Sequence, residues 1–151
     1  MDIPEAGPVE LADAVLRTAR RLRRANALEL EGSAVNPHQA RALRTIARLE
    51  PVRMADLAER LHVAARSATD VVEFLVAGGW VARIPDPSDG RARLLSLTPS
   101  GRWLLAEVDA ARARAAEGLF GGLADEQRQA VIEALSDAVA LVDSAEPPSK
   151  L

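Results

Sequence analysis

The chain has 151 residues, of which 48% are hydrophobic and 27% charged, a composition typical of a globular domain that buries its own core. It has no cysteine and only two histidines, His38 and His62. Thiol catalysis, iron–sulfur clusters and cysteine-based zinc sites are therefore excluded, and we expect neither a metal nor another cofactor. No apolar run approaches the roughly 20 residues of a membrane helix, and the acidic N-terminus is unlike a signal peptide. We expect a cytoplasmic protein without a membrane partner.

Charge is distributed unevenly along the chain. The net charge of −3 argues, taken alone, against a nucleic-acid partner. However, residues 103–151 carry a net charge of −5, whereas residues 1–52 and 53–102 carry +1 each. The acidity belongs to the C-terminal third, so local basic patches decide the choice of partner.

The first third of the chain predicts two helices. Residues 1–8 indicate a loose arm, and apolar residues at helical spacing predict a helix over 9–31. Asn36 and Pro37 form an N-cap and first-turn pair that opens a second helix, which ends at Pro51. One face of the first helix carries a basic stripe, interpreted as a solvated face with a ligand or DNA contact as the alternative: Arg17, Arg20, Arg21 and Arg24.

The next segment predicts a helix-turn-helix. Apolar residues recur at i, i+3, i+4 and i+7 in two short helices joined by a tight turn: Met54, Leu57, Ala58 and Leu61, then Ala68, Val71, Val72 and Leu75. His62 stands where such turns need a left-handed backbone, and histidine is enriched in that conformation. We expect Val63 to fill the turn from the core side.

A β-hairpin is predicted directly after the second of these helices. Its strands cover 81–84 and 91–97, its loop covers 85–90, and Leu95 and Leu97 share one face. A hairpin in this position is the wing of a winged helix-turn-helix. The predicted fold is therefore mainly α (an α+β winged helix-turn-helix), with about six helices and a two- to three-stranded wing sheet.

Two helices are predicted after the wing. Thr98 and Pro99 open a long helix, Gly121 and Gly122 end it, and a last helix stops before Pro147-Pro148. The apolar stripes of the N-terminal helix and of these two helices exceed what the central unit can cover, which predicts a homodimer. The expected interface residues are Leu11, Val15, Leu119, Val131, Leu135 and Val142.

Three regions follow from this pattern. Residues 1–34 form an arm and dimerisation helix, 35–102 a winged helix-turn-helix that binds DNA, and 103–151 the C-terminal dimerisation helices. We see no glycine-rich phosphate loop, nucleophile elbow or clustered acid–base pair, so we do not expect an enzyme.

Double-stranded DNA is the expected partner of the central region. In a helix-turn-helix the second helix enters the major groove with its N-terminal residues on base edges. Its outward residues here are Arg66, Thr69, Asp70 and Glu73, with Ser67 at the entrance. Glu73 is interpreted as a solvated residue or an intramolecular partner. On the wing, Arg91 and Arg93 suit the narrow minor groove, while Asp89 and Gly90 shape the loop. A salt bridge from Arg91 to Asp89 is the alternative.

Residues 51–102 resemble the winged-helix core of the MarR family of bacterial transcription regulators. The resemblance is carried by the runs DLAERL at 56–61 and RSAT at 66–69, by Asp89-x-Arg91, and by LTPSG at 97–101. It implies a homodimeric, nucleoid-associated repressor that binds a pseudo-palindromic operator with half-sites about 34 Å apart. It further implies release by a small, often aromatic or phenolic, ligand.

The resemblance also locates an effector pocket and shows departures from the family. By position, His38 and Trp103 are its pocket residues; the alternatives are an exposed helix-start residue and a core filler, respectively. Ser, Thr or Pro is common in the family at three positions that differ here, so both helices of the helix-turn-helix should be weakly capped: Arg53, Ala64 and Ala65. Asp70 and Phe74 leave the second helix poor in positive charge. Without cysteine, the protein cannot sense oxidation through a thiol.

A winged helix that contacts another protein rather than DNA is the alternative function. The acidic net charge and Asp70 favour that interpretation, whereas Arg66, Arg91 and Arg93 favour DNA.

Overall fold

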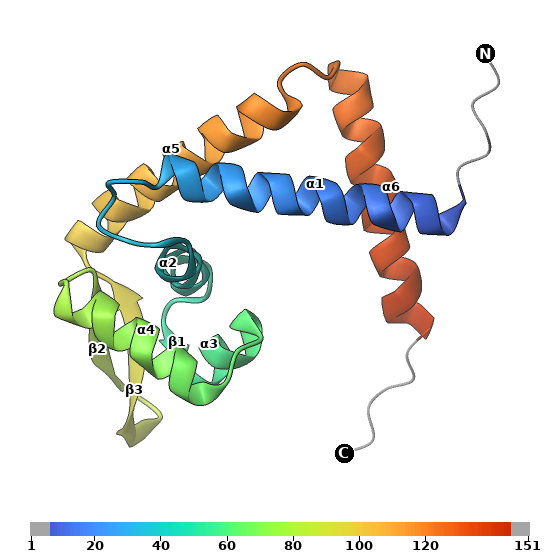
Figure 1. Ribbon diagram of the computed structural model, residues 1–151. Coiled ribbons are helices and arrows are strands. Elements are labelled where there is room, and N and C mark those ends of the chain that lie inside the picture. The colour runs from blue at the N-terminus through green and yellow to red at the C-terminus, as the bar shows by residue number, and fades with distance from the viewer. Residues whose placement is uncertain (1–6, 146–151) are drawn as a thin grey trace, which may run out of the picture. The chain divides into compact units, whose positions relative to one another are not determined.

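A computed structural model describes residues 7–145, in six helices and three strands (Figure 1). The elements are α1 (Pro8–Glu29), α2 (Pro37–Leu49), β1 (Val52–Arg53), α3 (Met54–Leu61), α4 (Ala65–Ala77), β2 (Val81–Asp86), β3 (Asp89–Leu97), α5 (Pro99–Phe120) and α6 (Asp125–Ala145). The chain divides into two compact units, one ending at Ala115 and the other beginning at Ala116. The predicted fold class is confirmed.

The first unit is built around α2. Figure 1 shows α3, α4 and the β2–β3 hairpin grouped together beside this helix. The largest fully buried side chains come from α2, α3, α4 and β3: Leu43, Ile46, Leu57, Val72, Leu75 and Leu95. Burying each such side chain contributes about 1.5–3 kcal/mol. The core therefore fixes the helix-turn-helix and the hairpin on one support.

Helix starts agree closely with the sequence pattern. Asn36 and Gln39 form a capping box, in which Asn36 Oδ1 accepts from the Gln39 amide at 2.9 Å and Gln39 Oε1 accepts from the Asn36 amide at 2.9 Å. Helix α1 begins at Pro8, within the segment expected to be a loose arm, because proline suits the first turn of a helix. Residues 1–6 of that arm, and Pro147-Pro148, lie outside the described residues.

The sheet has the strand order β1-β3-β2, with both pairs antiparallel. Val81 pairs with Leu97 and Val52 with Leu95, so the buried ends of the strands face the core. The predicted loop over 85–90 is wrong in length, because β2 continues to Asp86 and β3 begins at Asp89. Pro85 is tolerated in β2 because this is an edge strand, and a bulge follows it.

The turn between α3 and α4 has the predicted left-handed residue. His62 has φ 53° and ψ 46°, and the amide of Val63 donates to the carbonyl of Ala58 at 3.2 Å. The expectation for Val63 is wrong, since its side chain is 40% exposed. The buried residues on either side of the turn are instead Leu61 and Ala68.

Substitution of His62 tests the importance of this backbone conformation. We expect His62→Val to lower the free energy of unfolding by about 1–2 kcal/mol, because a β-branched residue is strained at positive φ. His62→Gly, which removes the strain, should be as stable as the parent or slightly more stable. Denaturant unfolding followed by circular dichroism measures both. Equal midpoints for the valine and glycine variants would contradict the argument.

Candidate nucleic-acid interface

Helix α4 has one buried face and one exposed face. Ala68, Val72 and Leu75 are buried, whereas the opposite side is exposed at every position that the sequence singled out: Arg66, Ser67, Thr69, Asp70 and Glu73. The structure thus brings the four predicted base-contacting residues of this helix onto one surface. The Thr69 hydroxyl donates to the Ala65 carbonyl at 2.9 Å, which leaves its methyl group and an oxygen lone pair for a partner.

The N-terminus of α4 is uncapped, as predicted. Ala64 is the N-cap residue of α4 and Arg53 that of α3, and neither side chain makes a capping hydrogen bond to its helix. Backbone N–H groups at an uncapped start are available to an anion such as a phosphate of DNA. The start of α4 can therefore accept an anion although the helix is poor in basic residues.

Glu73 is an intramolecular partner. Its Oε1 pairs with the guanidinium of Arg83 on β2. This ion pair links α4 to β2 of the wing, and both side chains are partly exposed to solvent. At that exposure it stabilises the fold only slightly. The ion pair also offsets the negative charge of Glu73 on the exposed face of α4.

The two wing arginines are in different situations. Asp89 accepts from the backbone amide of Arg91 at 3.0 Å, so its carboxylate shapes the turn rather than pairing with the Arg91 guanidinium. That guanidinium is exposed and makes no ion pair with any residue of the described chain. Arg93 instead folds back, donating to the carbonyls of Ala92 at 3.1 Å and Gly90 at 3.4 Å. Arg91 is thus the better placed of the two to reach a partner.

The tip of the wing is anchored by a cluster that the sequence did not reveal. Asp86, only 6% exposed, accepts from the Ser88 amide at 2.8 Å and the Ser88 hydroxyl at 2.7 Å. It also accepts from Nε of Arg53 at 2.9 Å, although Arg53 precedes it by 33 residues. The Asp-x-Ser spacing was a signal for the turn. Nothing in the sequence pointed to Arg53, which joins the wing to the start of α3.

Ionisation of Asp86 contributes to this anchor. The hydrogen bonds from Ser88, and then the guanidinium of Arg53, lower the pKa of Asp86 from 3.8 to about 2. A carboxyl group with a lowered pKa stabilises the fold above its unfolded pKa, and the contribution disappears as the pH falls through its folded value.

We therefore expect Asp86→Asn to be less stable than the parent at neutral pH. The difference in free energy of unfolding should shrink as the pH falls from about 4 towards about 2, because the parent carboxylate then becomes protonated. Denaturant unfolding of both proteins across this range measures it. A difference that stays constant with pH would show that charge at Asp86 contributes nothing.

The LTPSG motif joins the wing to α5 by a close backbone approach. The Thr98 hydroxyl caps α5 by accepting from the Gly101 amide at 3.0 Å, and it donates to the Gly79 carbonyl at 2.6 Å. A Cβ at Gly101 would lie 2.0 Å from the carbonyl oxygen of Trp80, so only glycine fits. Beside it, Glu50 accepts from the Leu97 amide at 2.8 Å and pairs with Arg102 at 2.8 Å. Burial raises the pKa of Glu50, but these bonds together lower it below its ordinary value.

The two residues predicted for an effector pocket are in different places. His38 is exposed at the start of α2 and lines a cavity of about 400 Å³ whose walls come from α1, α2 and α5. Trp103 is 81% exposed and does not line that cavity. The alternative for Trp103, a core filler, is wrong because Leu104 and Val108 occupy the buried stripe of α5. Leu30, Val108 and Arg112 line the cavity, although no sequence pattern indicated that they meet.

The residues predicted for dimerisation are mostly exposed. On α1, Leu11 and Val15 are exposed, and this helix contains no buried residue. In the second unit Leu119 is half-buried, whereas Val131, Leu135 and Val142 of α6 are exposed. The structure also exposes other apolar side chains on the same two helices: Val9, Leu16, Leu28, Ile132, Val139 and Leu141.

Among residues 7–145, no helix has the length and apolar character that crossing a bilayer requires.

Comparison with known proteins agrees with this geometry. Residues 35–92 match the model of the MarR family. An uncharacterized HTH-type transcriptional regulator of Mycobacterium bovis is 36% identical over 137 residues, which cover 89% of this chain and 91% of the relative. A crystal structure of a mutant MarR from E. coli superposes with a TM-score of 0.77 at 22% identity, covering 89% of this chain and 98% of that one. The same mutant complexed with operator DNA gives a TM-score of 0.71 at 22% identity, covering 85% and 92%. The chain belongs to the MarR family of winged helix-turn-helix transcriptional regulators.

Proposed function

We propose that this regulator is a homodimeric repressor that binds a pseudo-palindromic operator and is released from it by a small ligand. One observation carries the proposal: the outer face of α4 is exposed at every predicted base-contacting position, while the inner face is locked into the core. A surface of this kind beside an exposed arginine on the wing fits a major groove flanked by a minor groove.

Each predicted contact has a role in this proposal. Arg66 donates to a guanine edge or a phosphate, Ser67 and Thr69 bind phosphates or bases, and Asp70 accepts from a cytosine amino group. On the wing, Arg91 enters the minor groove, held by the turn that Asp89 and Gly90 form, and Arg93 supports it.

A dimer is supported by the exposed apolar side chains of α1 and α6. Leu11, Val15, Val131, Leu135 and Val142 are all at least 38% exposed, and a second copy is the occupant that would cover them. Leu119, at the end of α5, belongs to the same proposed interface. Two heads related by a two-fold axis would read two half-sites about one helical turn apart.

An effector is supported by the cavity that His38 lines. Its volume of about 400 Å³ suits a small organic molecule, and its walls combine apolar residues with arginines. A structural neighbour with a TM-score of 0.72, BpsR of Bordetella bronchiseptica, is described with regulation of its DNA binding by 6-hydroxynicotinic acid. We propose a ligand of similar size here, with His38 in the wall and Trp103 at the surface of α5.

Fluorescence anisotropy tests the proposal directly. The purified protein is titrated into labelled duplex from upstream of its own gene and into a scrambled duplex, at two salt concentrations. We expect at least a hundredfold preference for the upstream duplex and an affinity that falls as salt rises, by a slope of about −0.9 per phosphate contact. If the upstream duplex and a duplex selected from random DNA both bind no better than the scrambled one, DNA readout is wrong and a protein contact is favoured.

A further inference from the structure

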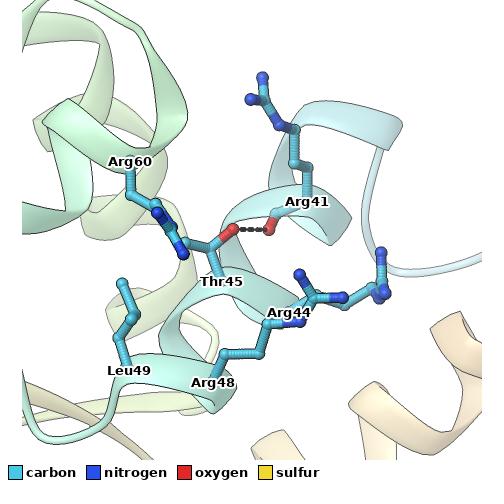
Figure 2. Close-up of a pocket in the computed structure, with 6 residues that line it drawn as sticks. All are labelled: Arg41, Arg44, Thr45, Arg48, Leu49 and Arg60. Carbon is cyan, nitrogen blue, oxygen red and sulfur yellow. Dashed lines mark hydrogen bonds between the residues drawn. The ribbon is translucent and has the colours of Figure 1, made fainter. Parts of the chain in front are cut away.

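A second hollow lies between α2 and α3, and four of its six lining residues are arginines. Figure 2 shows the six residues that line it. Arg41, Arg44 and Arg48 lie along α2, and Arg60 extends from α3. The hollow has a volume of about 210 Å³. Thr45 and Leu49 complete the lining, and no acidic side chain of the described residues belongs to it. The four arginines are called the arginine cluster below.

Little negative charge balances the arginine cluster. Arg44 pairs with Asp109 of α5 at 2.9 Å, and the other three make no ion pair with any residue described by the structure. The pKa of the neighbouring Arg112 lies below its ordinary value. Burial is the largest cause, and the positive charges of Arg44 and Arg48 lower it further. Four arginines around one hollow place like charges in one region of the surface. The arrangement therefore has a local excess of positive charge even though the chain as a whole is acidic.

Guanidinium groups are suited to oxyanions in particular. Each presents a planar fork of N–H donors that matches the oxygens of a phosphate or a carboxylate. The hydroxyl of Thr45 is already used, since it donates to the Arg41 carbonyl at 2.9 Å, so the guanidinium groups supply the polar contacts of the hollow (Figure 2). Two of the four side chains, Arg41 and Arg44, also line the cavity that contains His38.

We propose that the arginine cluster binds a small oxyanion carrying two or more negative charges, on phosphate or carboxylate groups. The volume of the hollow accommodates an anion of the size of pyrophosphate or citrate. Arg48 and Arg60 line this hollow and not the cavity that contains His38, whereas Arg41 and Arg44 line both. Binding of the anion does not depend on the DNA binding proposed above and is measured without DNA.

Isothermal titration calorimetry with pyrophosphate and with citrate tests the site and tells the two anion chemistries apart. Sodium chloride keeps the ionic strength constant, and the double variant Arg48→Gln/Arg60→Gln is compared with Arg17→Gln/Arg20→Gln. The control removes the same charge from exposed positions of α1 that line neither hollow. We expect saturable binding of at least one anion, at least tenfold weaker in the cluster variant and within twofold of the parent in the control.

Two further measurements keep the outcome decisive. Thermal unfolding verifies that the variants fold, and Arg48→Lys/Arg60→Lys, which keeps the charge but loses the planar forks, should bind the anion more weakly than the parent. Equal losses in the cluster variant and the control, or no binding beyond that of chloride, would overturn the proposal. If the parent binds neither anion and the cluster variant shows a smaller salt slope for DNA, the cluster contacts the DNA backbone instead.

Discussion

Arg91→Ala is expected to weaken operator binding by about 10- to 100-fold, which corresponds to about 1–3 kcal/mol. The reason is the position of this side chain. Asp89 holds the backbone of Arg91 through a 3.0 Å hydrogen bond, while the guanidinium is exposed and has no ion-pair partner among the described residues. A guanidinium presented in this way is attracted by the negative potential of a narrow minor groove. In a dimer both wings lose the contact.

Anisotropy with operator DNA measures this loss, and light scattering verifies that the dimer is intact. Arg17→Ala is the matched control, because it removes the same charge from an exposed position of α1. We expect Arg17→Ala to weaken operator binding only by the small amount that the loss of one positive charge per chain causes. Arg91→Lys should fall between the parent and Arg91→Ala, since lysine keeps the charge without the planar fork. Unchanged affinity of Arg91→Ala would contradict the assignment of the wing as a DNA contact.

Short-range signals predicted most of the fold. The i, i+3, i+4, i+7 spacing of apolar residues located both helices of the helix-turn-helix, and Asn36 marked the start of α2 through its own side chain. His62 could be predicted because few residues tolerate positive φ. Each of these features is determined by neighbours in the chain.

Features that depend on distant segments could not be predicted in this way. The wing turn was expected to be longer because Pro85 suggested a loop, whereas its place on an edge strand allows β2 to continue. The pair of Arg53 and Asp86 joins residues 33 positions apart, and the arginine cluster needs Arg60 from another helix. Trp103 has the size of a core residue, but the buried face of α5 contains Leu104, and Trp103 lies on the exposed face.

The proposed dimer interface also combines a feature that could be predicted from neighbouring residues with one that could not. Apolar spacing identified the faces of α1 and α6, but what covers them depends on the assembly. Val131 and Leu135 are 52% and 40% exposed on a helix whose side chains over 125–144 contain no buried residue. A helix with this much exposed apolar surface is expected to bury it against a partner.

Val131→Glu/Leu135→Glu is therefore expected to give monomers that have lost operator binding. In the proposed dimer the two substitutions introduce four carboxylates into an apolar interface, and burying each unpaired charge costs several kcal/mol. The dimer dissociation constant should rise by about a thousandfold or more, since each 1.4 kcal/mol is a factor of ten. Light scattering across a dilution series measures the assembly, and anisotropy measures DNA binding. A single head should retain only the weak, salt-sensitive binding of one half-site.

Gln129→Glu/Ala140→Glu provides the matched control on the same helix. It adds the same two charges per chain at exposed positions on the side of α6 opposite Val131, and losing the exposed hydrogen bond from Gln129 Nε2 to Glu133 at 2.7 Å should cost only a few tenths of a kcal/mol. This control should remain dimeric and bind the operator within a few-fold of the parent, because neither carboxylate enters the apolar face. If instead Val131→Glu/Leu135→Glu stays dimeric at the lowest concentrations, the interface lies elsewhere than on α6. If it becomes monomeric and still binds the operator with full affinity, one winged head suffices and the two-fold arrangement is wrong.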